Sequence, residues 1–139
     1  MSASIILPKI IVEELEKRAS TFNCTVEEYL LNILTRDNDP NETALKYVES
    51  ARGLVNQARE ELERNNLRKA SEKVWGACAL AIKAHALVKK KERIESCRDL
   101  WIYKNEVAKE LGDWVRIVFK LADSVHRNFY ENLAVDHFI

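Results

Sequence analysis

Apolar residues recur along most of the chain at the three- and four-residue spacing of helices that bury one face. The clearest example is the segment 39–63, in which charged side chains occupy the opposite side of the predicted helix. Its apolar positions are Ala44, Val48, Ala51, Val55, Ala58 and Leu62. The same pattern predicts further helices at residues 67–90, 96–111 and 113–129. Four helices with short links indicate an all-α, antiparallel four-helix bundle.

The N-terminal residues follow a different pattern. The run SASIILP is β-branched and closed by Pro8, which predicts a short edge strand. Two short helices should follow, the second of them starting at a capping box formed by Thr25 and Glu28. Asp39 and Pro40 then fit the N-cap and the first position of a new helix. We therefore divide the chain into a strand-helix-helix arm, 1–37, as a possible dimerisation module, and a helical bundle, 38–139.

The segment KASEKVWGACALAIKAHA, residues 69–86, is apolar on every side over its middle part. A helix without a polar face must be central and contact several neighbours. Gly76 lies beside a stripe of small residues, which would allow a partner helix to approach closely. The stripe consists of Ala70, Val74, Ala77, Ala81 and Ala84. Tight packing is the favoured interpretation of the segment.

Composition excludes several classes of protein. Acidic and basic residues balance at 22 each, so no global charge favours nucleic acid. Three widely separated cysteines disfavour a disulfide framework or a zinc cluster, and they indicate reduced thiols in the cytoplasm. No apolar run is long enough to cross a bilayer. The sequence has neither a glycine-rich phosphate loop nor a nucleophile elbow, and no cofactor is expected.

Two charged residues bracket the apolar segment and are candidate binding residues. Glu72 is expected to meet Arg98 or Lys104 from another helix, and Lys83 is expected to meet Asp123. In the favoured interpretation their role is structural, and they form ion pairs at the ends of a packed helix. In the alternative interpretation their role is functional, and they line a groove that binds an anion.

The last predicted helix carries a second polar group. Asp123, His126, Arg127 and Tyr130 share one face by their spacing. A histidine beside a carboxylate can act as a general base and an arginine can hold phosphate, so His126, Arg127 and Tyr130 are weak catalytic candidates. The alternative is an exposed Asp123–Arg127 ion pair with His126 half buried. Asp123-x-x-His126 is also half of a di-iron helix motif, but the other half has no counterpart, so no metal site is expected.

The central segment resembles the signature of the archaeal PaREP family. The matching elements are Glu61-Leu62, Ala70-Ser71-Glu72-Lys73, Trp75-Gly76-Ala77, Lys83-Ala84, and His126 with Phe129, Tyr130 and Glu131. This resemblance covers about residues 39–133. It departs from the family at Ser96-Cys97, where the family commonly has Ser-His.

Membership of this family implies a bundle similar to HEPN domains, which often bind nucleotides or RNA. HEPN ribonucleases carry an arginine followed by a histidine one or two helical turns later. Arg127-Asn128 begins such a motif, but Asn132, Leu133 and Ala134 supply no histidine. The ribonuclease motif is therefore incomplete.

The N-terminal order of strand, helix and capped helix is similar to ribbon-helix-helix repressors, which dimerise by pairing strands. One side of the predicted strand carries Ser2, Ser4 and Ile6, and the other carries Ala3, Ile5 and Leu7. Neither side offers an arginine or lysine to read bases, which disfavours DNA binding. The arm either pairs between chains or packs on its own bundle.

The leading hypothesis is a non-enzymatic binding module that forms a homodimer or higher homo-oligomer and has RNA or a nucleotide as a candidate ligand. A HEPN-type ribonuclease or nucleotide-processing enzyme is the first alternative, and a ribbon-helix-helix-like transcription regulator is the second. The incomplete arginine–histidine motif disfavours the first alternative, and the uncharged strand disfavours the second.

Overall fold

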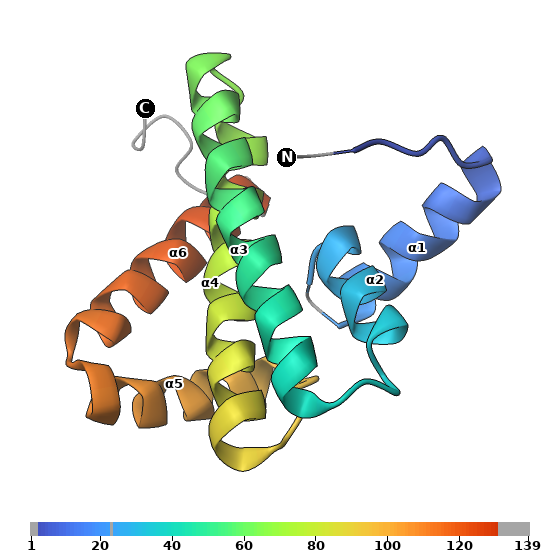
Figure 1. The fold of residues 1–139 in the computed structure, drawn as a ribbon. Coiled ribbons are helices and arrows are strands. Elements are labelled where there is room, and N and C mark those ends of the chain that lie inside the picture. Colours follow the sequence, from blue (N-terminus) through green and yellow to red (C-terminus); the bar gives the residue numbers. More distant parts are fainter. Residues whose placement is uncertain (1–2, 23, 131–139) are drawn as a thin grey trace.

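The computed structural model describes residues 3–22 and 24–130, the last four of these by their backbone alone (Figure 1). The described chain is all-α. Its helices are α1 (Lys9–Thr21), α2 (Val26–Leu34), α3 (Pro40–Glu63), α4 (Leu67–Lys90), α5 (Cys97–Leu111) and α6 (Trp114–Tyr130). In this part of the chain, no helix is both long and apolar enough to cross a membrane.

Side-chain caps define where three of the helices begin. Thr25 Oγ1 accepts a hydrogen bond from the Glu28 backbone N–H at 3.1 Å, at the start of α2. Asp39 accepts from two backbone N–H groups in the first turn of α3, and Ser96 accepts from Asp99 N–H at 3.0 Å, at the start of α5. Each cap satisfies amide groups that a helix leaves without a partner. These three predicted starts are confirmed.

The α3–α4 hairpin is the centre of the molecule, with α1 and α2 on one side of it and α5 and α6 on the other (Figure 1). Asn65 takes a positive φ of 63° in the turn between the two helices, a conformation that asparagine tolerates. Leu54 of α3 and Leu80 and Leu87 of α4 are almost completely buried in one core cluster. The helix that is apolar on every side, α4, is thus the central one, as the sequence predicted.

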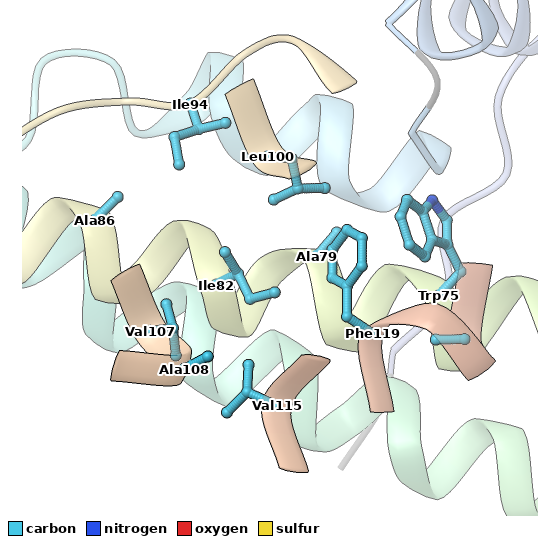
Figure 2. Close-up of a cluster of buried hydrophobic side chains, with 11 residues drawn as sticks. Trp75, Ala79, Ile82, Ala86, Ile94, Leu100, Val107, Ala108, Val115 and Phe119 are labelled. Carbon is cyan, nitrogen blue, oxygen red and sulfur yellow. The ribbon is translucent and has the colours of Figure 1, made fainter. Parts of the chain in front are cut away.

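A second core cluster joins α4 to α5 and α6 (Figure 2). Phe119 is completely buried and contacts two indole rings edge-on. Its ring centroid lies 5.3 Å from that of Trp75 and 4.9 Å from that of Trp101. Such edge contacts add to the stabilisation that burial of the rings supplies. Phe119 therefore connects all three helices.

The four long helices do not close into the predicted antiparallel bundle. α3 packs along α4, whereas α6 packs on α4 and α5 contacts α4 and α6. α2, which the sequence prediction assigned to a separate arm, lies against the α3–α4 hairpin. Thr25 approaches Gly76 at the seam of α3 and α4, so α2 occupies one side of the hairpin. α5 and α6 gather on the other side, and α3 keeps one face uncovered.

The predicted N-terminal strand is wrong for the described chain, because residues 3–8 have no regular secondary structure. A strand requires a neighbour with which to share hydrogen bonds, and none of the described residues pairs with this segment. α1 packs on α2 through buried Ala19. The link from α2 to α3 is held by Arg93, whose guanidinium donates to the Thr35 carbonyl oxygen and to Asn32 Oδ1.

Replacement of Gly76 with leucine is expected to destabilise the protein by about 1–3 kcal/mol, because it would overpack the site. A Cβ at this position would lie 3.2 Å from both Leu54 Cδ1 and Thr25 Cγ2. Gly53 is the matched control, since a Cβ there meets no atom within 4 Å. Thermal unfolding should show a lower midpoint for Gly76→Leu and no loss for Gly53→Leu. Equal midpoints for the two variants would contradict close packing at Gly76.

Candidate functional site

Lys83 forms a buried ion pair with a residue of the N-terminal helices. Its Nζ lies 3.0 Å from Glu28 Oε1, and the Glu28 side chain is 3% exposed. Burial raises the pKa of Glu28, and the nearby ammonium group of Lys83 opposes this shift. The predicted pairing of Lys83 with Asp123 is therefore wrong. From the sequence, Glu28 was predicted to have only a capping role. Its backbone N–H fills that role, while its side chain pairs with Lys83 of α4.

The two cations that were predicted to pair with Glu72, Lys104 and Arg98, have other surroundings in the structure. Lys104 donates to the Trp101 carbonyl oxygen at 3.0 Å, and its Nζ lies 4.6 Å from the centre of the Trp101 ring. Desolvation by burial lowers the pKa of Lys104. Arg98 is exposed on the first turn of α5. Neither cation forms an ion pair with Glu72 among the residues that the structure describes.

The polar face of α6 is partly buried against α4. Asp123 is buried, which differs from the exposed ion pair of the alternative interpretation. The His126 ring is half buried, as that interpretation expected, and stacks on the indole of Trp75 with centroids 5.6 Å apart. Lys83 pairs with Glu28 of α2 and not with Asp123 of this face.

Several predicted residues of the C-terminal region cannot be placed on the structure. The side chains of Arg127 and Tyr130 lie outside the described part of the chain, as do Glu131 and the segment 132–134. The spacing that puts Arg127 and Tyr130 on one face with Asp123 therefore stays a prediction.

A polar cluster that sequence reasoning missed joins α4 to α5. His85 Nε2 lies 2.6 Å from Glu110 Oε2, and His85 Nδ1 lies 2.7 Å from the Tyr103 hydroxyl oxygen. Lys89 Nζ is 3.2 Å from the other Glu110 carboxylate oxygen. Hydrogen bonds from His85 and Lys89 lower the pKa of Glu110. A carboxylate only accepts, so His85 Nε2–H is the donor, and each group is used in holding the two helices together.

An open apolar groove of about 870 Å³ lies between α3, α4 and α6, and Val107 and Leu111 of α5 also line it. α3 contributes Val48, Ala51, Arg52, Val55, Ala58, Arg59 and Leu62. α4 contributes nine residues from Leu67 to His85, and α6 contributes residues that include Trp114, Val118, Leu121 and Val125. The sequence assigned most of these apolar positions to the closed core of a bundle, and it gave no signal that a covering helix is missing.

The remaining candidate chemistry is sparse. No group of three or more potential metal ligands occurs in residues 3–22 and 24–130. The three cysteines carry free thiols. Burial raises the pKa of Cys78 to about 11 and, with a smaller contribution from Glu28, that of Cys24 to about 12. At neutral pH these two side chains are therefore almost entirely in the poorly nucleophilic thiol form.

Comparison with known families identifies the chain by the segment that lines the groove and forms most of both core clusters. The model of the archaeal PaREP1/PaREP8 family matches residues 46–138. The chain belongs to this family. The predicted PaREP membership is confirmed, and the match begins inside α3, so α1 and α2 lie outside it. Neither curated proteins nor solved structures give a significant match.

Proposed function

We propose that this PaREP1/PaREP8 protein is a non-enzymatic, homo-oligomeric binding module of the cytoplasm. The observation that carries the proposal is the open groove between α3, α4 and α6. Its lining includes large apolar side chains that are more than half exposed, among them Leu62, Trp114 and Leu121. Contiguous apolar surface of this kind is typical of sites that bind another molecule.

The polar side chains support binding rather than catalysis. Lys83 is held by Glu28, and His85 is held by Glu110 and Tyr103, so both act as links between helices. A general base must reach the proton that it abstracts from a substrate. His126 is half buried and stacks on Trp75, which restricts the access of a substrate to its ring.

RNA or a nucleotide is the proposed ligand of the assembled module. The resemblance to HEPN-like bundles supports this choice, and two arginines supply cationic groups. They are Arg98 and Arg127. An arginine can contact a phosphate by two parallel hydrogen bonds. Double-stranded DNA is disfavoured, because the arm carries no base-reading side chain on residues 2–7.

The ligand proposal predicts that Arg98→Ala/Arg127→Ala binds single-stranded RNA or ATP at least about tenfold more weakly than wild type. One charge-assisted contact contributes about 1.5–3 kcal/mol, and 1.4 kcal/mol corresponds to a factor of ten. Fluorescence anisotropy with a labelled oligouridine, and a competition titration with ATP, would measure the change. Lys46→Ala/Arg64→Ala removes the same charge from exposed positions of α3 and its C-cap, and it should bind as wild type does.

Other outcomes of this titration decide between the alternatives. Equal affinities of wild type and the arginine variant, or no binding by wild type, would exclude the ligand proposal. Cleavage of the RNA by wild type, lost in His126→Ala, would support the ribonuclease alternative. Tight binding of duplex DNA would support the ribbon-helix-helix-like regulator.

A further inference from the structure

The N-terminal segment, residues 3–21, exposes several large apolar side chains. Ile5, Ile6 and Ile10 are 81%, 96% and 76% exposed. α1 packs on α2 and extends away from the α3–α4 hairpin (Figure 1). Neighbouring apolar side chains on one segment indicate a surface that is covered in the functional state.

The groove has the geometry of a bundle that lacks one helix. On α3, the lining positions Val48, Val55 and Leu62 are separated by seven residues each, and Trp114 and Leu121 of α6 have the same separation. Seven-residue apolar repeats are typical of surfaces that pack along another helix. The stretch from Val48 to Leu62 is about 21 Å long at the helical rise, and α1, with 13 residues, is about 20 Å long.

The groove carries two cationic side chains. Arg52 and Arg59 line the groove on α3 and form no ion pair among the described residues. α1 carries three glutamates, Glu13, Glu14 and Glu16, that can pair with these arginines, and its own basic residues, Lys9, Lys17 and Arg18, balance them in number. Glu13 and Glu14 form only exposed pairs within α1, which contribute little, and Glu16 has no ion pair in the described chain.

The segment cannot cover the groove of its own chain in this arrangement. α2 is fixed to the body by the Glu28–Lys83 ion pair and by the contact between Thr25 and Gly76. α1 therefore starts on the side of the hairpin that is opposite to α6 (Figure 1). The N-terminal segment of a second copy is not restricted in this way and can reach the groove. The second copy also has a groove of its own, which can bind the segment of the first copy.

We propose that residues 3–21 of one copy bind in the α3–α4–α6 groove of a second copy, and that the exchange is reciprocal. A two-fold dimer then covers both apolar surfaces of both chains and leaves no free binding surface for further copies. The proposal rests on the homo-oligomeric state given above and specifies its contact. It differs from a ribbon-helix-helix-like dimer, in which the two N-terminal segments would pair with each other.

Complementation between two variants tests this contact. Ile6→Asp/Ile10→Asp disables the segment and leaves the groove intact. Val55→Asp/Leu121→Asp disables the groove and leaves the segment intact. All four positions are at least 41% exposed, so the helices should form in both variants, which circular dichroism would verify. The control, Leu45→Asp/Ile102→Asp, places the same charges on exposed apolar positions outside the groove.

We expect dimers of wild type and of the control, and monomers of the two variants, in sedimentation and native mass spectrometry. An equimolar mixture of the two variants should regain a heterodimer, because one intact segment meets one intact groove. If the groove variant loses helicity, Arg52→Glu/Arg59→Glu replaces it in the same mixture.

Each other result overturns the proposal in a distinguishable way. A dimeric groove variant would show that the N-terminal segments pair with each other. A dimeric segment variant would show that the grooves pack on each other. A mixture that stays monomeric would exclude the exchange. A monomeric wild type would exclude the homo-oligomeric function as well as the contact.

Discussion

Replacement of Lys83 with methionine is expected to lower the free energy of unfolding by about 3–5 kcal/mol. The substitution leaves the buried Glu28 carboxylate without its counter-ion, and Glu28 has no comparable cation to replace it among the described residues. Methionine keeps most of the side-chain volume, so the loss reports the charge and not a cavity. Urea unfolding of wild type and variant at the same protein concentration would measure the loss, so that self-association would affect both proteins alike.

The stability that Lys83→Met loses relative to wild type should decrease as pH falls. Burial already raises the folded-state pKa of Glu28, and removal of Lys83 raises it further. A carboxyl group with a raised folded-state pKa holds more protons in the folded state than in the unfolded state, so stability falls as pH rises through this range. The difference in the free energy of unfolding between wild type and Lys83→Met should therefore be largest above the folded-state pKa of Glu28. It should shrink as pH falls towards the unfolded-state pKa of Glu28.

The double variant Glu28→Leu/Lys83→Met is the control for this prediction. It removes both charges, so it should recover much of the lost stability and the pH dependence should disappear. A single variant that unfolds at the same urea concentration as wild type at every pH would contradict the description of this pair as buried and coupled.

Replacement of Phe119 with alanine should cost about 3–5 kcal/mol, the range for removal of a large ring from a core. The ring is completely buried between Trp75 and Trp101, so the truncation opens a cavity bounded by two rigid indoles that cannot easily collapse into it. Phe119→Leu retains much of the volume and should cost clearly less. Ile117→Ala is the surface control, because Ile117 is exposed on the same helix.

Unfolding in urea would again give the free energies, and tryptophan fluorescence should shift in Phe119→Ala, because two of the three indoles lose their packing partner. A loss that matches that of Ile117→Ala would mean that α6 is not anchored through Phe119. The attachment of α6 to α4 would then depend on other contacts.

The sequence predicted local structure well where a side chain acts on its own backbone. Thr25, Asp39 and Ser96 cap the helices that follow them, and each was recognisable because a cap depends on residues only two or three positions away. The central position of α4 was also predictable, because this helix is apolar on every side. A helix with no polar side must be surrounded, whatever surrounds it.

Contacts between distant segments were not predictable in the same way. Glu28 meets Lys83 across 55 positions of sequence, and no periodicity specifies which carboxylate reaches a given lysine. The groove was missed because an apolar stripe shows that a helix face avoids water, but not whether the same chain covers it. Val55 and Leu62 have the pattern of core residues and are nevertheless exposed in a single chain.

The α3–α4 hairpin has a consequence for how the chain folds. Its two helices are joined by a short turn, and they share more close contacts than any other pair of helices in the described chain. Contacts between segments close in sequence form early, since little loop entropy is lost when they form. We expect the hairpin to be structured in the folding transition state, with α2 and α6 docking on it later. Substitutions at Leu54 or Leu80 would then slow refolding, whereas loss of Phe119 would mainly accelerate unfolding.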